Sequence, residues 1–450
     1  MIERTSVSAT QVTRSFVVVL VLLTGLSALP ADAQEKMGFT FFGEMNFNFR
    51  DSKYVEHRLN VPFPPEFWEA GDDAVYLRTV DPGTHFEMSD IELGLDANFA
   101  KKFRGRVLVH VIDLYNRNPT SIDQDVFVRE FWLRYGEVDR QHRKLEPWAW
   151  YVEAGKAPRF AKQVVRHLES YGLWGTAVNR FEIPQIQVGV NLGGSFYARG
   201  QYGIAGPLFM RDPNALAGDN GTWDRVPGNV NPQYNSGFPI LYDARPKNFS
   251  LDGEVELGGG LGWRWANDEG KKSVDVMAWY YSRTLEDAPE IEGTFYQGDL
   301  ELLRGAGWPL PFEGDEKWEA GLNVDWRLGG WVGFAQFVKQ DIASLERQGL
   351  EIETAFHIPI PSLFAAWETP VFNWIRPAVR YSQIDNDFWM WDPFITPSMY
   401  WDWQKLDVGL RIGIVRSSDI TIEYTFNKAK LQDGSTLEPN EWLVSWRIFW

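Results

Sequence analysis

Apolar and polar side chains alternate along much of this chain. In residues 38–50, Phe39 and Phe41 fall on one face, and Glu44 and Asn46 fall on the other. Successive side chains of a β-strand point to opposite faces, so a period of two predicts a strand with one apolar and one polar face. The same alternation returns along the chain, in residues 90–99, 185–192, 251–265, 318–327, 350–358, 405–414, 420–427 and 442–450.

The last nine residues carry the clearest alternation. Trp442, Trp446 and Trp450 share one face, and the chain stops on the last of them. Such an ending resembles the closing strand of bacterial outer-membrane β-barrels, where this segment is also the signal for the barrel assembly machinery. We therefore expect the three indoles to face outer-membrane lipid.

Alternation alone does not separate a barrel from a soluble sandwich, which also has one apolar face per strand. Nearly every polar face here carries charged residues, which a packed core cannot accept without pairing. A sheet closed around water accepts them. The pattern therefore predicts an all-β protein, a transmembrane antiparallel β-barrel.

The connections predict the strand number. Short or fairly short links fall at residues 100–104, 137–146, 193–195, 266–272, 329–330, 359–373 and 415–418. Longer segments lie between them, at 51–85, 116–124, 157–181, 206–248, 285–316, 339–348, 385–402 and 428–438. Short periplasmic turns that alternate with long extracellular loops are typical of these barrels. The count is about 16 strands, with fourteen or eighteen as the alternatives, because several strands are irregular.

The N-terminal segment is typical of a secretory signal. Arg4 and Arg14 precede the apolar residues 16–29, and Ala31 and Ala33 give a small-x-small cleavage pattern. We expect residues 1–33 to be cleaved and residues 34–450 to form the barrel; a retained anchor helix is the alternative. The sequence has no Cys, which excludes disulfides, a lipid anchor on Cys and Cys-based metal sites.

Composition agrees with a barrel. Mean hydropathy is only −0.31, because a barrel strand shows lipid at every second residue. Aromatic residues make up 15% of the chain, with 22 Trp, and interfacial girdles are the natural place for them. The net charge of −17 argues against a nucleic-acid partner.

Sixteen strands enclose an aqueous channel, so the pattern predicts passage of small polar solutes or ions, without a cofactor, a metal or catalytic residues. On the strands with clear alternation, inward acids outnumber inward bases. The candidate lumen residues on the wall are Asp90, Glu92, Asp96, Asp252, Glu254, Glu256, Arg376 and Arg380.

The third long loop, residues 157–181, has the opposite charge. The loop and the residue before it contain one acid, Glu169, and a set of bases: Lys156, Arg159, Lys162, Arg166 and Arg180. Folded into the lumen, it would constrict the channel and set a basic edge against acidic walls, with a transverse field between them. The alternative is an exposed loop whose charges are solvated.

The layout resembles sixteen-stranded porins. Residues 153–160, EAGKAPRF, form a strand end that opens the third loop, and this stretch is similar to the phosphate-selective, porin O/P-like proteins. The resemblance implies that Lys156, Arg159 and Lys162 attract anions, and porins of this size imply a homotrimer. The acidic wall departs from the arginine-rich wall of that family.

Other functions remain as alternatives. A barrel enzyme of lipase or protease type would need a paired His, and the candidates are His57 and His85, with Asp72, Asp73 and Asp81 between them. A polysaccharide export channel is the third class. In residues 206–248, clustered Asp and Asn side chains suit either Ca²⁺ or ordinary turns, and turns are favoured.

Overall fold

The computed structural model describes the barrel strands and part of their connections. The described residues are 38–59, 75–79, 83–99, 102–112, 126–136, 142–162, 165–174, 182–206, 208–211, 235–236, 240–243, 253–285, 291–292, 315–361, 364–366, 369–387, 402–431 and 434–450. The expected signal segment lies outside them. Among the described residues, no helix is long and apolar enough to cross a bilayer.

Sixteen strands in the described part of the chain form one closed antiparallel barrel. They are β1 (Gly38–Ser52), β4 (Gly83–Phe99), β5 (Phe103–Ile112), β6 (Val126–Gly136), β7 (Trp150–Pro158), β8 (Glu182–Leu192), β9 (Phe196–Ile204), β13 (Val255–Ala266), β14 (Lys272–Thr284), β16 (Glu316–Leu328), β17 (Trp331–Ile342), β18 (Leu345–Phe356), β22 (Trp374–Asp387), β23 (Asp402–Val415), β24 (Ser418–Lys430) and β26 (Glu441–Phe449).

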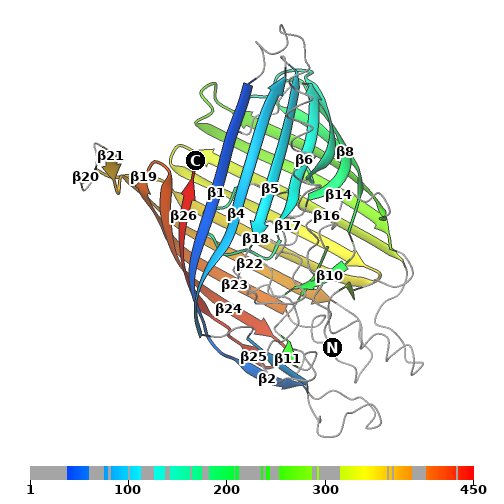
Figure 1. Cartoon of the computed structure of the whole chain (residues 1–450). Helices are drawn as coiled ribbons and strands as arrows, with labels where there is room; N and C mark the ends of the chain where they lie inside the picture. Colours follow the sequence, from blue (N-terminus) through cyan, green and yellow to red (C-terminus); the bar gives the residue numbers. More distant parts are fainter. Residues whose placement is uncertain are drawn as a thin grey trace.

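Closure comes from the first and last strands, which lie side by side in Figure 1. β1 pairs with β4 on one edge and with β26 on the other, so that Glu44 lies opposite both Glu92 and Phe449. β9 pairs with β13 across the longest connection. The predicted fold class and strand number are confirmed.

Shorter strands accompany the barrel. β19 (Ile358–Pro359) and β25 (Thr436–Leu437) extend its sheet, and β20 (Phe364–Ala366) pairs with β21 (Thr369–Val371) in a hairpin that projects from the wall (Figure 1). The long connections contribute β2 (Glu56–Leu59), β3 (Val75–Arg78), β10 (Leu208–Arg211), β11 (Asn235–Ser236), β12 (Ile240–Asp243) and β15 (Ile291–Glu292).

The prediction of a long loop at residues 339–348 is wrong. β17 and β18 are joined by a two-residue turn at Ala343 and Ser344, with φ of 51° and 73°. Positive φ at both turn residues matches the twist of a tight hairpin, but Asn and Gly are the residues that usually signal it. Ala and Ser gave no such signal, so the sequence pattern missed the turn.

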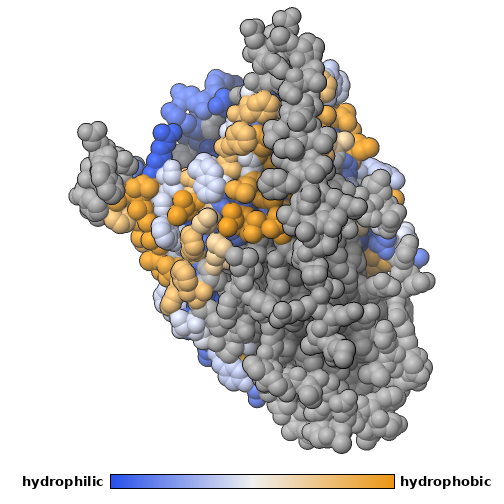
Figure 2. Space-filling model, in the orientation of Figure 1, coloured by the Kyte–Doolittle hydropathy of each residue, from blue (hydrophilic) through white to orange (hydrophobic). Residues whose placement is uncertain are grey.

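The barrel is apolar outside and polar inside. Large apolar side chains such as Phe41 and Leu261 are among the most exposed, while Arg50, Glu351 and Arg380 are almost fully buried. Figure 2 shows apolar residues gathered on the outer face around β1 and β26. The three C-terminal indoles also lie on this outer surface, each about half exposed. This is the surface of a barrel that spans a bilayer.

A small apolar core lies inside the lumen. Trp279, Tyr281 and Trp403 point inward from β14 and β23 and pack with Leu173 and Trp174 of the third long connection. Gly321 leaves space for the indole of Trp279, because a Cβ there would overlap its ring. This core gives the connection a surface on which to dock.

Candidate functional site

The third long connection enters the lumen where β7 ends. Its described residues, 159–162 and 165–174, are called the inner loop here. Gln185 of β8 fixes the exit of the chain: its amide nitrogen donates to the carbonyl oxygens of Ala157 and Pro158, at 2.6 and 2.8 Å. The next residue, Arg159, is then buried against the wall on β13 and β16.

The first turn of the inner loop is held by ion pairs and by the apolar core. Arg159 pairs with Glu256 and with Glu319, the latter at 2.5 Å. The amide nitrogen of Ala161 donates to the Tyr281 hydroxyl at 3.2 Å, and Asn323 donates to the Ala161 carbonyl at 2.9 Å. The loop therefore crosses from β7 to the opposite part of the barrel wall.

Lys162 does not reach that opposite wall. Its ammonium pairs with Glu182, the first residue of β8. Burial lowers the pKa of Lys162, although Glu182 favours its charged form. The positive charge of Lys162 is thus largely matched within its own part of the lumen.

Three wall carboxylates accept hydrogen bonds from the backbone of the inner loop. Glu353 accepts from the amide of His167, Glu423 from the amides of Glu169 and Ser170, and Glu351 from the amide of Trp174. All three glutamates are completely buried. A buried carboxylate requires such partners, because burial of an unpaired charge is costly.

Two wall bases complement this pattern by donating to loop carbonyls. Arg380 donates to the Ser170 carbonyl at 2.8 Å, and Lys405 donates to the Tyr171 carbonyl at 2.6 Å. Arg380 also bridges Asp407 and Glu353, at 2.8 and 3.2 Å. Predicted as a lumen residue, it lies fully buried beneath the loop.

Trp174 fixes the end of the inner loop. Its indole nitrogen donates to the Gln383 carbonyl at 2.8 Å, and the ring lies over Gly349 of β18. A Cβ at Gly349 would lie 1.7 Å from the indole nitrogen, so only glycine leaves this space. The loop is therefore seated in a recess of the wall.

Between the inner loop and the remaining wall lies a cavity of about 760 Å³. Its described lining contains more basic than acidic side chains. The basic ones are Arg106, Arg129, Arg134, Arg159, Lys162, Arg166, Arg199, Arg376, Arg411 and Arg447; the acidic ones are Glu44, Asp90, Glu92, Glu130, Glu153 and Glu169. The acidic wall expected from the sequence differs from this lining, because the carboxylates of β18 and β24 are covered by the loop.

Arg166 presents its guanidinium group to this cavity. Its guanidinium lies 4.1 Å from the centre of the Tyr171 ring, and its buried Nη1 has no hydrogen-bond partner among the described residues. Burial opposes ionisation of Glu169 nearby, but Arg411 and Arg447 outweigh it and hold the pKa of this carboxyl below its usual value.

Aromatic rings orient other guanidinium groups of the lining. Arg134 lies 4.3 Å from the ring centre of Tyr151, and Arg199 lies 4.5 Å from that of Tyr197. Stacking on an aromatic face holds a guanidinium in place while leaving its edge for other partners.

Several predicted site residues lie elsewhere. Lys156 is buried in the wall and donates to the Val128 carbonyl at 3.1 Å. Asp96 pairs with Arg104 and Arg106. A further ion pair joins Glu254 to Arg283 at 3.3 Å. Arg180 and Asp252 lie outside the described residues.

Arg129 is a lining residue that the sequence pattern missed. The register of β5 and β6 shifts, so that Leu108 pairs with Glu130 and Val109 pairs with Val128. This bulge leaves Arg129 without a cross-strand partner and brings it into the lumen next to Glu130. A bulge breaks strict alternation, and β6 showed no clear period for that reason.

Most candidate residues for an enzyme site or a Ca²⁺ site lie outside the described residues. His57 lies on β2, and His85 is a backbone position of β4 opposite Arg50. Asp72, Asp73 and Asp81 lie outside the described residues, as do the Asp and Asn clusters of residues 206–248.

Comparisons with known proteins bear on the fold alone. No family model and no curated protein matches this chain. OmpF of Salmonella typhi, solved with daunomycin, is 11% identical over 93% of this chain and 99% of its own, with a TM-score of 0.50. The outer membrane channel DcaP of Acinetobacter baumannii is 10% identical over 93% and 98%, with a TM-score of 0.48.

OprB of Pseudomonas putida is 11% identical over 93% of this chain and 95% of its own, with a TM-score of 0.48. At these identities the likeness to OmpF establishes a shared fold. A closed barrel with this fold and this apolar outer surface is an integral protein of the outer membrane.

Proposed function

We propose that this protein is an outer-membrane diffusion channel for small polar and charged solutes, that the inner loop constricts it, and that it favours anions. The observation that carries the proposal is the division of the wall carboxylates. Those on β18 and β24 bind the backbone of the inner loop, which leaves a cavity whose charged lining contains more basic than acidic side chains.

Opposite charges that border the same cavity support the same proposal. Arg166 of the loop and the carboxylates of Glu44, Asp90 and Glu92 border one cavity. A constriction with one sign of charge on the loop and the other on part of the wall orients dipolar solutes as they pass. The excess of guanidinium groups elsewhere in the lining would set the overall preference for anions.

The resemblance to phosphate-selective porins enters this proposal only as an anion preference. Phosphate itself is tested by competition: in a phosphate-selective channel, added phosphate lowers the chloride current. The proposal also includes lipid around the barrel, the assembly machinery at β26 and a homotrimer, as expected from the sequence. It includes no enzymatic activity.

The test is conductance in a planar lipid bilayer. The purified protein is expected to give discrete current steps, and reversal potentials in asymmetric KCl are expected to indicate anion preference. Arg166→Glu changes the local charge by two units and should shift the anion-to-cation permeability ratio by at least about fivefold toward cations, since one charge about 4 Å from a passing ion contributes about 1 kcal/mol in water.

Lys162→Glu should act in the same direction but also repel Glu182. Lys339→Glu is the matched control, because Lys339 is exposed on β17 and pairs with Glu346 away from this cavity. The absence of current steps would refute the channel. Equal reversal potentials for wild type and Arg166→Glu would refute the role of the loop.

A further inference from the structure

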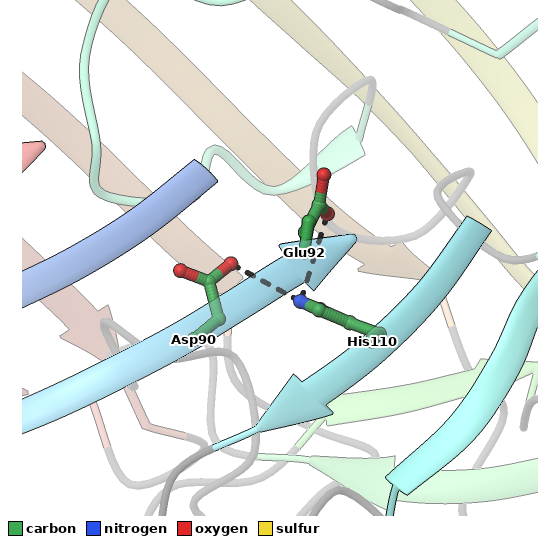
Figure 3. A group of neighbouring side chains, drawn as sticks. All are labelled: Asp90, Glu92 and His110. Carbon is green, nitrogen blue, oxygen red and sulfur yellow. Dashed lines mark hydrogen bonds and ion pairs between the residues drawn. The ribbon is translucent and has the colours of Figure 1, made fainter. Parts of the chain in front are cut away.

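Three potential metal ligands converge on the acidic side of the lumen wall. Asp90 and Glu92 are two residues apart on β4, so both point to the same face. His110 of β5 lies directly opposite Glu92 in the strand register. Figure 3 shows the imidazole ring directed at both carboxylates.

The separations suit a tetrahedral metal ion. His110 Nε2 lies 3.1 Å from Asp90 Oδ2 and 3.6 Å from Glu92 Oε1, and the three ligand atoms lie within 4.8 Å of one another. Bonds of about 2.0–2.1 Å to Zn²⁺ place adjacent tetrahedral ligands about 3.3 Å apart. The two distances from the imidazole, to Asp90 and to Glu92, bracket that value.

The surroundings of His110 suit a metal ligand. The residue is 4% exposed, its Nδ1 is buried without a hydrogen-bond partner among the described residues, and its Nε2 faces the two carboxylates. The edge of the Phe127 ring packs beside it. A nearly buried imidazole aimed between two carboxylates is an arrangement that a metal ion satisfies.

The neighbours of the carboxylates act as an outer shell. Asn46 donates to Asp90 Oδ1 at 2.7 Å, which leaves Oδ2 directed at His110. Arg129 pairs with Glu92 but also with Glu182 at 3.0 Å, so it keeps a partner when Glu92 turns to a metal. Outer-shell hydrogen bonds of this kind orient metal ligands.

We propose that Asp90, Glu92 and His110 form a binding site for a divalent transition-metal ion, with Zn²⁺ favoured and water as the fourth ligand. Two carboxylates balance the charge of the ion, and the imidazole nitrogen selects against Mg²⁺ and Ca²⁺, which prefer oxygen ligands. Binding itself does not depend on the proposed function. Its consequence does: in a channel, bound Zn²⁺ neutralises this side of the constriction and occupies part of its cross-section.

The test is calorimetric titration of EDTA-treated, detergent-solubilised protein with ZnCl₂ at neutral pH. Wild type is expected to bind one ion per chain, with no comparable heat from MgCl₂. His110→Ala should weaken binding by at least about 100-fold, and Asn46→Ala by roughly 10–100-fold, the usual range for loss of an outer-shell partner.

His57→Ala is the control, because it removes an imidazole from β2 in another part of the chain. Glu92→Gln gives a second ligand variant if His110→Ala fails to fold, and it should also weaken binding. No binding by wild type would overturn the site, as would unchanged binding by a folded ligand variant; Asp90 and His110 would then be an ordinary ion pair.

Bilayer currents separate this inference from the proposed function. ZnCl₂ should reduce the current of wild type and leave that of His110→Ala unchanged. Zn²⁺ binding without any channel current would refute only the function. Channel current without Zn²⁺ binding would refute only the metal site.

Discussion

Carboxylates occupy two parts of the inner wall, and their surroundings differ. On β18 and β24, Glu351, Glu353 and Glu423 are 0% exposed and bind the backbone of the inner loop. On β1 and β4, the side chains of Glu44 and Glu92 remain 31% and 24% exposed and border the cavity. The first group fixes a segment of the protein, while the second remains available to solutes and ions.

This difference explains why the charge of a lumen cannot be obtained by counting residues on strands. The charge of a buried carboxylate is balanced by amide donors and by Arg380. Such a carboxylate contributes little to the electrostatic potential that a passing ion experiences. A partly exposed carboxylate, such as Glu44 or Glu92, contributes directly to that potential. Glutamate therefore binds the inner loop on one wall and sets the charge of the cavity on the other.

The largest effect is expected from removing the base that supports the loop-binding wall. Arg380→Ala leaves Glu353 and Asp407 buried with less compensation, which should lower the free energy of unfolding by about 3–5 kcal/mol. Urea unfolding in detergent, followed by Trp fluorescence, measures it. Lys339→Ala, which breaks an exposed pair with Glu346, should change the free energy of unfolding very little. Equal losses in the two variants would contradict the supporting role of Arg380 beneath the loop.

The next effect concerns selectivity and contrasts one acid from each wall. Measured at about pH 9, Glu44→Gln removes a charge that borders the cavity and should raise the anion-to-cation permeability ratio by about twofold or more. Glu351→Gln keeps an acceptor oxygen for the Trp174 amide and should leave the ratio unchanged. Reversal potentials of both variants check this. A larger shift for Glu351→Gln than for Glu44→Gln would reverse the comparison.

The smallest effect concerns the connection between β6 and β7. Burial, followed by repulsion from Arg327 and Arg264, lowers the pKa of His142 to about 4, against about 6.5 in an unfolded chain. Between these values the unfolded chain binds a proton that the folded protein excludes. The stabilisation is therefore complete above about pH 6.5 and is lost as the pH falls toward 4.

The unfolding midpoint should accordingly drop between pH 7 and pH 5 by less in His142→Asn than in wild type. His57→Asn serves as the control for other titrating groups. An identical pH dependence in wild type and His142→Asn would show that His142 does not contribute.

Alternation predicted the barrel because lipid and water impose it on every strand. The strand of Trp318, Leu322 and Glu319 has the same parity in the structure as in the sequence: Leu322 is exposed and Glu319 is buried inside. The turn at Ala343 and Ser344 was missed because its backbone conformation has no composition signal. Arg129 was missed because a bulge interrupts the period of two.

The seat of the inner loop could not be predicted from local pattern. Trp279 and Trp403 look like girdle residues in the sequence, but they point inward and form the apolar core on which the loop packs. Their role depends on contacts with Leu173 and Trp174, which are distant in the chain. Pairing of Arg159 with Glu256 and Glu319 likewise becomes visible only when distant strands are brought together.

The anchors of the inner loop also set an order of assembly. Glu169 meets Glu423 across 254 positions of the chain, and His167 meets Glu353 across 186. Contacts of such long range form late, since the intervening chain must first be organised. Until the C-terminal third of the barrel is in place, residues 165–174 lack the wall carboxylates that bind them. The lumen of a partly assembled barrel is therefore wider than the lumen of the finished protein.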